Sequence, residues 1–323
     1  MSIATRFAPS PTGALHLGHA YAALIAHDVA RAAGGAFLLR FDDLDTGRVK
    51  PGADAAILRQ LAALGVEPDA APVYQSQRTA LYDQSLATLA EAGLTYPCFC
   101  TRREIAAEIA ASASAPHGID GPLYPGTCRH LSSERRAKRI AAGEPHAIRL
   151  DAARAAEQAG PLSWQDQRRG DDPHPPGAAR LPPSPGARGT AYPSPSGGGM
   201  GPWSHPCMPL VAGDVVLKRR DGAHAYHLAS TVDDAAVGVS DVTRGADLFA
   251  ATHVHRLLQA LLGLPTPRYH HHALVADVQG RRLATRDAVA DLDALARAGW
   301  SGEALAHAIR IGQLPLGFML VEG

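Results

Sequence analysis

The sequence predicts an α/β fold in which helices cover a doubly wound parallel sheet. Short apolar runs alternate with segments of helical periodicity over the first hundred residues, which is the βαβ pattern that builds parallel sheets. A Pro/Gly-rich loop separates the opening strand-like run from the first helical segment. Together these observations favour a Rossmann-like architecture that binds a nucleotide.

The individual elements follow from the spacing of apolar residues and from the glycines that end each run. We expect strands over residues 3–8 and 37–41 and helices over residues 18–33 and 79–92. A further helix begins near Pro51 and ends near Gly65. The helix between Pro51 and Gly65 carries an apolar stripe of Ile57, Leu58, Leu61 and Leu64. The helix over residues 79–92 carries a stripe of Tyr82, Leu86 and Leu89. Later, residues 213–219 are expected to form a strand, followed by a turn at Asp221-Gly222 and then a partner strand or a helix from Ala223.

The chain divides by composition into six expected regions. They are residues 1–95, the first half of the nucleotide-binding fold; 96–130, a small cysteine-bearing insertion; 131–170, a connecting subdomain; 171–209, a disordered insertion dense in Pro, Gly and Ser; 210–290, the second half of the fold; and 291–323, a helical C-terminal segment.

Bulk properties exclude several classes of protein. The 323 residues contain no signal-peptide core and no run of roughly 20 apolar residues, so we expect a soluble cytoplasmic protein without a membrane span. Three of the four cysteines lie in one short region, which favours a metal site over disulfides. Thirty-one basic and thirty-one acidic residues balance, so composition gives no argument for nucleic-acid binding. The basic residues between Arg129 and Arg139 are more typical of a solvated helix face.

The strongest chemical signal is the string from Arg6 to Gly13, followed at once by His16-Leu17-Gly18-His19. A strand, a Pro/Gly loop and a helix start form an anion site, because free backbone N–H groups and the helix dipole point at a bound phosphate. The two histidines add donors, and the glycine between them lets a nucleotide approach the backbone closely.

This string resembles the first signature of class I aminoacyl-tRNA synthetases, specifically their glutamyl and glutaminyl branch. The resemblance implies that His16, Gly18 and His19 bind ATP, and that both histidines act in catalysis by stabilising charge on the α-phosphate. It also implies that the opening strand and loop bind the amino acid glutamate, through Arg6, Phe7, Ala8, Pro9 and Ser10. The chemistry agrees, since attack of a carboxylate on phosphorus gathers negative charge that fixed donors stabilise.

Further strings match this branch in the same order along the chain. Arg40-Phe41-Asp42-Asp43-Leu44-Asp45 resembles Arg-x-Glu-Asp-x-Asp, which implies that Asp42 binds the substrate ammonium group with one methylene less than the usual glutamate. Tyr226 is implied to contact glutamate. Arg244, which opens Arg-Gly-Ala-Asp-Leu, is implied to bind a substrate carboxylate with its guanidinium fork. Strings typical of the branch are also found at Tyr74–Arg78, Lys218–Gly222 and Val232-Asp233-Asp234.

The cysteine-bearing insertion resembles the zinc site of the glutamyl-queuosine enzymes of this family. The resemblance implies one structural zinc ion held by Cys98, Cys100, Cys128 and the hydroxyl of Tyr124, and three thiolates with one oxygen form an acceptable zinc ligand set. His117 or His130 could replace Tyr124 as the fourth ligand.

The second class I signature is degenerate in this chain. The string Arg282-Leu283-Ala284-Thr285-Arg286 aligns with it, so Arg282 and Thr285 are implied to contact ATP and act in catalysis, although Thr285 replaces a lysine. Losing such a cation typically costs some hundred- to thousandfold in rate. Arg281 or Arg286 could compensate for the missing lysine.

We expect no anticodon-binding domain after the second signature, and a chain of this length also resembles the glutamyl-queuosine enzymes. This resemblance implies that a monomer uses ATP with Mg²⁺ to activate L-glutamate and transfers it to the queuosine base of tRNA(Asp). Two alternatives stay open: a truncated glutamyl-tRNA synthetase that charges 3′ ends, and a catalytically weakened or silent relative that only binds nucleotide or tRNA.

Overall fold

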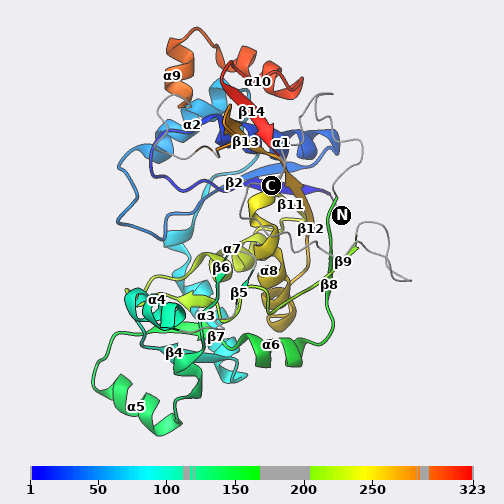
Figure 1. Cartoon of the computed structure of the whole chain (residues 1–323). Helices are drawn as coiled ribbons and strands as arrows, with labels where there is room; N and C mark the ends of the chain where they lie inside the picture. The colour runs from blue at the N-terminus through cyan, green and yellow to red at the C-terminus, as the bar shows by residue number, and fades with distance from the viewer. Residues whose placement is uncertain are drawn as a thin grey trace.

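The computed structural model describes residues 2–111, 117–118, 121–167, 204–281, 283 and 291–321 (Figure 1). Its strands are β1 (Ala4–Phe7), β2 (Ala36–Phe41), β3 (Val73–Tyr74), β4 (Thr95–Cys98), β5 (His117–Gly118), β6 (Gly121–Pro122), β7 (Ala147–Leu150), β8 (Ser163–Gln165), β9 (Ser204–Pro206), β10 (Val216–Lys218), β11 (Asp241–Gly245), β12 (Arg268–His272), β13 (Leu274–Asp277) and β14 (Phe318–Val321). Its helices are α1 (Leu17–Ala32), α2 (Ala53–Ala63), α3 (Thr79–Glu91), α4 (Arg102–Ala111), α5 (Ser133–Ala141), α6 (Ala152–Ala159), α7 (Tyr226–Ala236), α8 (Phe249–Leu261), α9 (Leu292–Arg297) and α10 (Gly302–Arg310).

Five parallel strands form the centre of the fold. β1 pairs in parallel with β2, β2 with β3, and β11 with β12. The backbone N–H of Ser240 donates to the carbonyl of Ala4 at 3.0 Å, which places the start of β11 beside β1. The parallel sheet β3–β2–β1 and the parallel pair β11–β12 therefore lie edge to edge, with β11 next to β1. This confirms the predicted α/β class with a parallel sheet.

The core of the first half forms where the sequence places it. Ile57, Leu61 and Leu64 are at most 2% exposed and pack with α1 and β2 in one cluster, while Tyr82 and Leu89 are buried in a second cluster with α7 and α8. The periodicity of apolar residues therefore identified the buried faces of α2 and α3 correctly.

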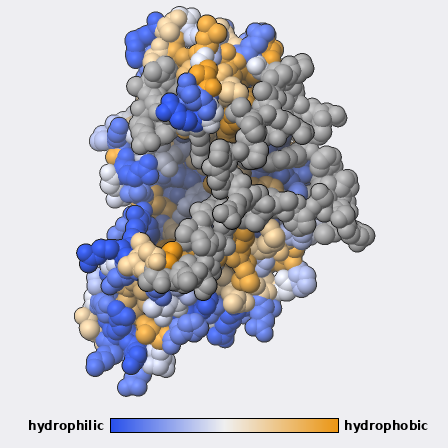
Figure 2. All heavy atoms as spheres, viewed as in Figure 1, coloured by the Kyte–Doolittle hydropathy of each residue, from blue (hydrophilic) through white to orange (hydrophobic). Residues whose placement is uncertain are grey.

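A separate antiparallel sheet, in the order β10–β7–β4, carries the cysteine-bearing region at the end of the molecule away from α9 and α10 (Figure 1). Its strands come from three of the regions expected from composition. Helix α5 lies at the far end of this lobe and buries none of its side chains. Hydrophilic residues predominate on this part of the surface (Figure 2).

Two expectations about the chain need correction. Disorder was expected over 171–209, but Ser204–Pro206 form β9, which pairs with β8 because His205 stacks on Trp164 with ring centroids 4.7 Å apart. Residues 171–203 lie outside the described part. The C-terminal segment is not only helical, because the apolar run Phe318–Val321 pairs with β13 as strand β14. The expectation for the segment after Asp221-Gly222 is confirmed, because His224 makes one bridge with Lys218 and helix α7 then begins at Tyr226.

Among the residues that the structure describes, no helix combines the length and apolar character that crossing a membrane would require.

Candidate functional site

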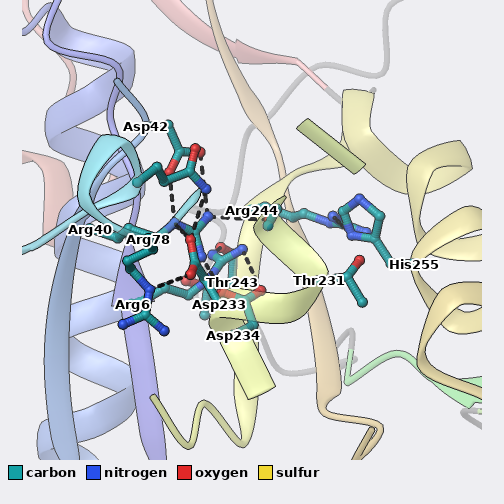
Figure 3. Close-up of polar contacts among 12 residues, drawn as sticks. Arg6, Arg40, Asp42, Arg78, Thr231, Asp233, Asp234, Thr243, Arg244 and His255 are labelled. Atoms are coloured by element: carbon teal, nitrogen blue, oxygen red, sulfur yellow. Dashed lines mark hydrogen bonds and ion pairs between the residues drawn. The ribbon is translucent and has the colours of Figure 1, made fainter. Parts of the chain in front are cut away.

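A buried ionic network lies where β1, β2 and α7 meet (Figure 3). Arg6 of β1 donates to both oxygens of Asp234, at 3.1 and 3.3 Å, and Arg40 of β2 donates to the same carboxylate at 2.5 Å. Both arginines are at most 5% exposed. Burial alone would raise the pKa of Asp234, but Arg6 and Arg40 hold it below its ordinary value. Asp234 therefore fixes the two strands in register with α7.

The neighbouring acid, Asp233, connects the network to the segment that leads from β3 into α3. Its carboxylate accepts from Arg78 at 2.6 Å, from Gln75 at 3.0 Å and from the hydroxyl of Tyr82 at 2.7 Å. Each of these three partners is a donor, as a fully buried carboxylate requires.

Asp42 lies at the mouth of this network. Its Oδ1 accepts from Nε of Arg40 at 2.6 Å, and its backbone N–H donates to the carbonyl of Pro9 at 3.0 Å. The loop after β1 and the acid after β2 are therefore in direct contact. Burial raises the pKa of the Asp42 carboxyl, although Arg40 opposes this.

Arg244 of β11 differs from the other buried arginines in its partners. Its Nε donates to Nε2 of His271 at 3.3 Å, its Nη1 lies 3.2 Å from Nδ1 of His255, and its Nη2 donates to the hydroxyl of Thr252. Its guanidinium also lies 5.0 Å from the centroid of the Tyr269 ring. Within the described ranges all its hydrogen-bond partners are neutral groups, and the charge of Arg244 is only 5% exposed.

Burial and the charge of Arg244 explain why the adjacent histidines are neutral. Burial first, and Arg244 second, lower the pKa of His255 well below its ordinary value. The same two causes lower the pKa of His227, whose Nδ1 lies 3.3 Å from His255, to about 4. Tyr226, at the start of α7, packs its ring 5.4 Å from that of His255 and stays 38% exposed.

The two histidines of the first signature lie at the N-terminus of α1, and both side chains accept backbone N–H groups there. Nδ1 of His16 accepts the backbone N–H of Gly18 at 3.1 Å, and Nδ1 of His19 accepts the backbone N–H of His16 at 3.2 Å. A Cβ at Gly18 would lie 3.0 Å from the His16 ring, so a larger residue would push against it. Because both Nδ1 atoms accept, each neutral ring carries its proton on Nε2.

A cavity of about 170 Å³ opens beside this helix start. Its lining brings together His16, Gly18 and His19 with Gly245 and Asp247 of the Arg-Gly-Ala-Asp-Leu string, and with Leu283 of the second signature. Gly245 directly follows Arg244 in β11, so the cavity reaches the backbone next to this arginine. Both signatures and the β11 string therefore meet at one cavity.

The C-terminal part also lies against the first signature. The backbone N–H of Leu292 donates to the carbonyl of Leu15 at 2.9 Å, and His16 forms a bridge with Asp291. Gln60 connects the two segments, since it accepts from the backbone of Leu15 and donates to Asp293, both at 2.8 Å. Arg282 and Thr285 lie outside the described residues.

The predicted metal ligands converge. The sulfur atoms of Cys98, Cys100 and Cys128 all lie within 4.8 Å of one another, and the Tyr124 hydroxyl lies 3.4 Å from Cys98 and 3.6 Å from Cys100. A tetrahedral zinc ion with Zn–S bonds of roughly 2.3 Å places neighbouring sulfurs roughly 3.8 Å apart, so this donor set fits the ion. His130 is exposed and outside this cluster. The side chain of His117 is not among those described.

Three arginines contact the residues around the cysteine cluster, while α5, which carries most of the basic run, is a solvated helix as the sequence predicts. The guanidinium of Arg139 lies 4.1 Å from the centroid of the Phe99 ring, and that of Arg149 lies 4.0 Å from the Tyr124 ring. Arg129 donates to the buried carboxylate of Asp214 at 3.0 Å. These contacts anchor the cluster to the antiparallel sheet.

Several residues of the site were not singled out from the sequence. Asp166, Thr252, His255 and His271 surround Arg244, and the available signal was the run of histidines in Arg268–His272. Four residues of the ionic network lie in strings that match the family, but the sequence alone assigned no role to them: Arg40, Arg78, Asp233 and Asp234.

An α/β nucleotide-binding fold in which two histidines of a helix start share a cavity with a C-terminal loop defines a class I synthetase fold. The model of "tRNA synthetases class I (E and Q), catalytic domain" matches residues 2–171 and 207–314. The chain belongs to this family. The residues that the family model leaves unmatched, 172–206, coincide with most of the insertion expected from composition.

Curated relatives cover nearly the whole chain. "Glutamyl-Q tRNA(Asp) synthetase" of Rhodobacter capsulatus is 44% identical over 88% of this chain and 91% of its own length. The protein with the same name from Nocardia farcinica is 44% identical over 93% of this chain and 81% of its own length. Among solved structures, a glutamate tRNA ligase from Elizabethkingia meningosepticum in complex with its amino acid matches with a TM-score of 0.65 at 26% identity. The match covers 89% of this chain and 52% of that one, so the chain spans about half of that structure.

Proposed function

We propose that this chain is a ligase that activates L-glutamate with ATP and transfers the glutamyl group to the queuosine base of tRNA(Asp). Membership of the class I family supports the use of ATP and an amino acid. The names of curated relatives at 38–44% identity support the acceptor. The glutamate site itself is supported by one structural observation, the environment of Arg244.

The charges around the site leave a place for a substrate carboxylate. Among the described residues, three arginines of the network face three aspartates: Arg6, Arg40 and Arg78 against Asp42, Asp233 and Asp234. Arg244 has only neutral acceptors. Among the described residues no carboxylate hydrogen-bonds directly to Arg244, so its fork is the natural ligand for an incoming carboxylate, which it can bind with two hydrogen bonds.

The remaining glutamate contacts are assigned to groups around Arg244. The carboxylate of Asp42 faces the substrate ammonium group, and Tyr226 closes the site at the start of α7. The loop Phe7, Ala8, Pro9 and Ser10, whose Pro9 carbonyl accepts the backbone N–H of Asp42, is assigned to the same site. Three of the five N–H groups of Arg6 donate to Asp234 and to the carbonyl of Thr243. The other two N–H groups of Arg6 are assigned to the substrate.

ATP is assigned to the cavity beside α1. His16 and His19 use Nδ1 in capping the helix, so their Nε2–H groups are the donors for phosphate oxygens, and Gly18 gives the nucleotide room. A glutamate carboxylate oxygen attacks the α-phosphorus, the bond to the β-phosphate bridging oxygen breaks, and pyrophosphate leaves. Arg282, Thr285 and Mg²⁺ are assigned to the phosphates. Leu283 and Asp291, which lie on either side of residues 284–290, are both at the His16 turn.

A structural zinc ion is assigned to Cys98, Cys100, Cys128 and Tyr124. When bound, the ion cross-links β4 to the segment around Cys128 and thereby stabilises the part of the molecule built on the antiparallel sheet β10–β7–β4. We also propose that the domains of the chain meet near residues 95, 130, 170, 209 and 290.

Glutamate-dependent exchange of labelled pyrophosphate into ATP tests the activation step. We expect exchange with glutamate and much less with glutamine or aspartate. Transfer is then tested with tRNA(Asp) that either carries queuosine or carries guanosine in its place. Label that stays on the queuosine tRNA alone supports the proposal, and equal labelling of both tRNAs would instead favour charging of the 3′ end. A pure protein without any exchange would refute activation.

A further inference from the structure

A buried carboxylate distant in sequence reaches Arg244 through a histidine. Asp166 directly follows β8, is 1% exposed, and bridges in its backbone to Tyr269 of β12. Its Oδ2 lies 3.1 Å from Nδ1 of His271, and its Oδ1 accepts the backbone N–H of His271 at 3.3 Å. On the other side of the same ring, Nε2 of His271 accepts from Nε of Arg244 at 3.3 Å. Asp166, His271 and Arg244 therefore form a continuous chain of hydrogen bonds.

The two neighbours of His271 determine which of its nitrogens carries the proton. The Nε–H group of Arg244 can only donate, so the facing Nε2 has to present its lone pair. The hydroxyl of Thr252, which lies 3.1 Å from the same Nε2, donates to it as well. The proton then resides on Nδ1 and is donated to the carboxylate of Asp166. The opposite tautomer would point one N–H group at another and leave a lone pair facing the carboxylate.

We propose that Asp166 is a positioning residue for the amino-acid substrate, because it holds His271 in the tautomer that fixes the guanidinium plane of Arg244. The inference rests on the proposed role of Arg244 as ligand of the substrate carboxylate. The Nε, Nη1 and Nη2 atoms of Arg244 each have one hydrogen-bond partner, which are His271, His255 and Thr252 in that order. Because Nη1 and Nη2 carry two N–H groups each, one N–H group remains on each of them. These two parallel donors match the two oxygens of a carboxylate.

An asparagine at position 166 tests this arrangement, because it changes one acceptor into a donor. The backbone N–H of His271 can only donate, so the asparagine oxygen has to face it. The NH₂ group then faces Nδ1 and drives the proton to Nε2, against Arg244. In the Asp166→Asn variant we expect the KM for glutamate in pyrophosphate exchange to rise about 10- to 100-fold, the factor that corresponds to losing a hydrogen bond to a charged group. The KM for ATP should stay within about twofold.

Two comparisons separate positioning from a general loss of structure. Asp241→Asn is the matched control, since Asp241 is a buried carboxylate on the strand of Arg244 that binds Arg268 instead. It should leave the KM for glutamate unchanged. In a His271→Gln background, which has no tautomer to lose, Asp166→Asn should add less than about twofold. An unchanged KM in Asp166→Asn, or an equal rise in Asp241→Asn, would overturn the inference.

A measurement on unaltered Asp166 covers the case in which the asparagine variant does not fold. The ¹⁵N shifts of His271, assigned by their loss in His271→Gln, should report a protonated Nδ1 and an unprotonated Nε2; the reverse pattern would overturn the inference. Arg244→Gln tests the proposed function separately. If that variant keeps the KM for glutamate of the original protein, Arg244 does not bind the substrate. If Arg244→Gln raises this KM but Asp166→Asn does not, only the positioning role fails.

Discussion

The imidazole rings of His16 and His19 lie stacked with their centroids 3.7 Å apart, and each accepts a backbone N–H group at the first turn of α1. One nitrogen of each ring therefore stabilises the helix, and the other is assigned to the nucleotide. This division allows the structural and catalytic contributions of the same side chain to be measured separately.

His16→Asn should keep the cap and remove the catalytic donor. The side-chain oxygen of asparagine takes the place of Nδ1, and asparagine is a preferred N-cap residue. We expect the midpoint of thermal unfolding to stay nearly unchanged while the rate of pyrophosphate exchange falls about 100-fold, as for loss of one donor to a transition-state oxyanion. His16→Ala, which also loses the cap, should in addition lose about 1 kcal/mol of stability. An exchange rate within a few-fold of the original in His16→Asn would contradict the role of His16 in binding phosphate.

The purified protein should contain about one zinc ion per chain. Cys100→Ser and Cys128→Ser each remove a thiolate from the cluster, so we expect both variants to lose the ion and several kcal/mol of stability, because metal binding and folding are coupled. His130→Asn should retain it, since His130 is exposed and outside the cluster. Elemental analysis and thermal unfolding measure both effects. Full zinc content in Cys128→Ser would contradict the proposed ligand set.

Stability should fall as the pH is lowered from about 6.5 to 4. Burial first, and then the charges of His205 and Arg244, lower the pKa of His253 to about 4 from an ordinary value of 6.5. The unfolded chain therefore binds this proton at a higher pH than the folded one, and the free energy of unfolding rises with pH across that interval. One such group contributes about 3 kcal/mol between the two limits. Above pH 6.5 the contribution is fully present.

His253→Asn tests the assignment of this slope. Nδ1 of His253 accepts from the Trp164 indole at 3.2 Å and from the backbone of Met208 at 3.1 Å, and the asparagine oxygen can accept from both. Denaturant unfolding at several pH values should show a shallower dependence between pH 4 and 6.5 in this variant, by up to one proton. His130→Asn, at an exposed site, serves as the control. An unaltered slope in His253→Asn would assign the dependence to other groups, such as His227 and His255.

Site residues that lie in recognisable strings could be predicted from the sequence, whereas contacts between residues far apart in the chain could not. His16, His19 and the three cysteines could be singled out because they lie in strings that resemble motifs of a known family. Asp166 and His271 could not, since 105 positions separate them and only the bridge between Asp166 and β12 brings them together. Strand β14 was missed for the same reason, because its partner β13 lies more than 40 positions earlier.

Thr285→Lys should raise the rate of glutamate-dependent pyrophosphate exchange. Class I enzymes of this branch use a lysine at the matching position, and a cation beside the leaving pyrophosphate stabilises charge that develops in the transition state. The N-terminal signature already presents its histidines at the cavity that Leu283 also lines, so the added ammonium group would join an assembled site. We expect an increase of about 100-fold in kcat with a smaller change in the KM for glutamate. Thr285→Gln, which has a long but neutral side chain, should give no increase and so separates charge from size. If lysine also leaves kcat unchanged, an arginine of the second signature already supplies the cation, and Arg286→Gln in the original chain should then lower kcat by a comparable factor.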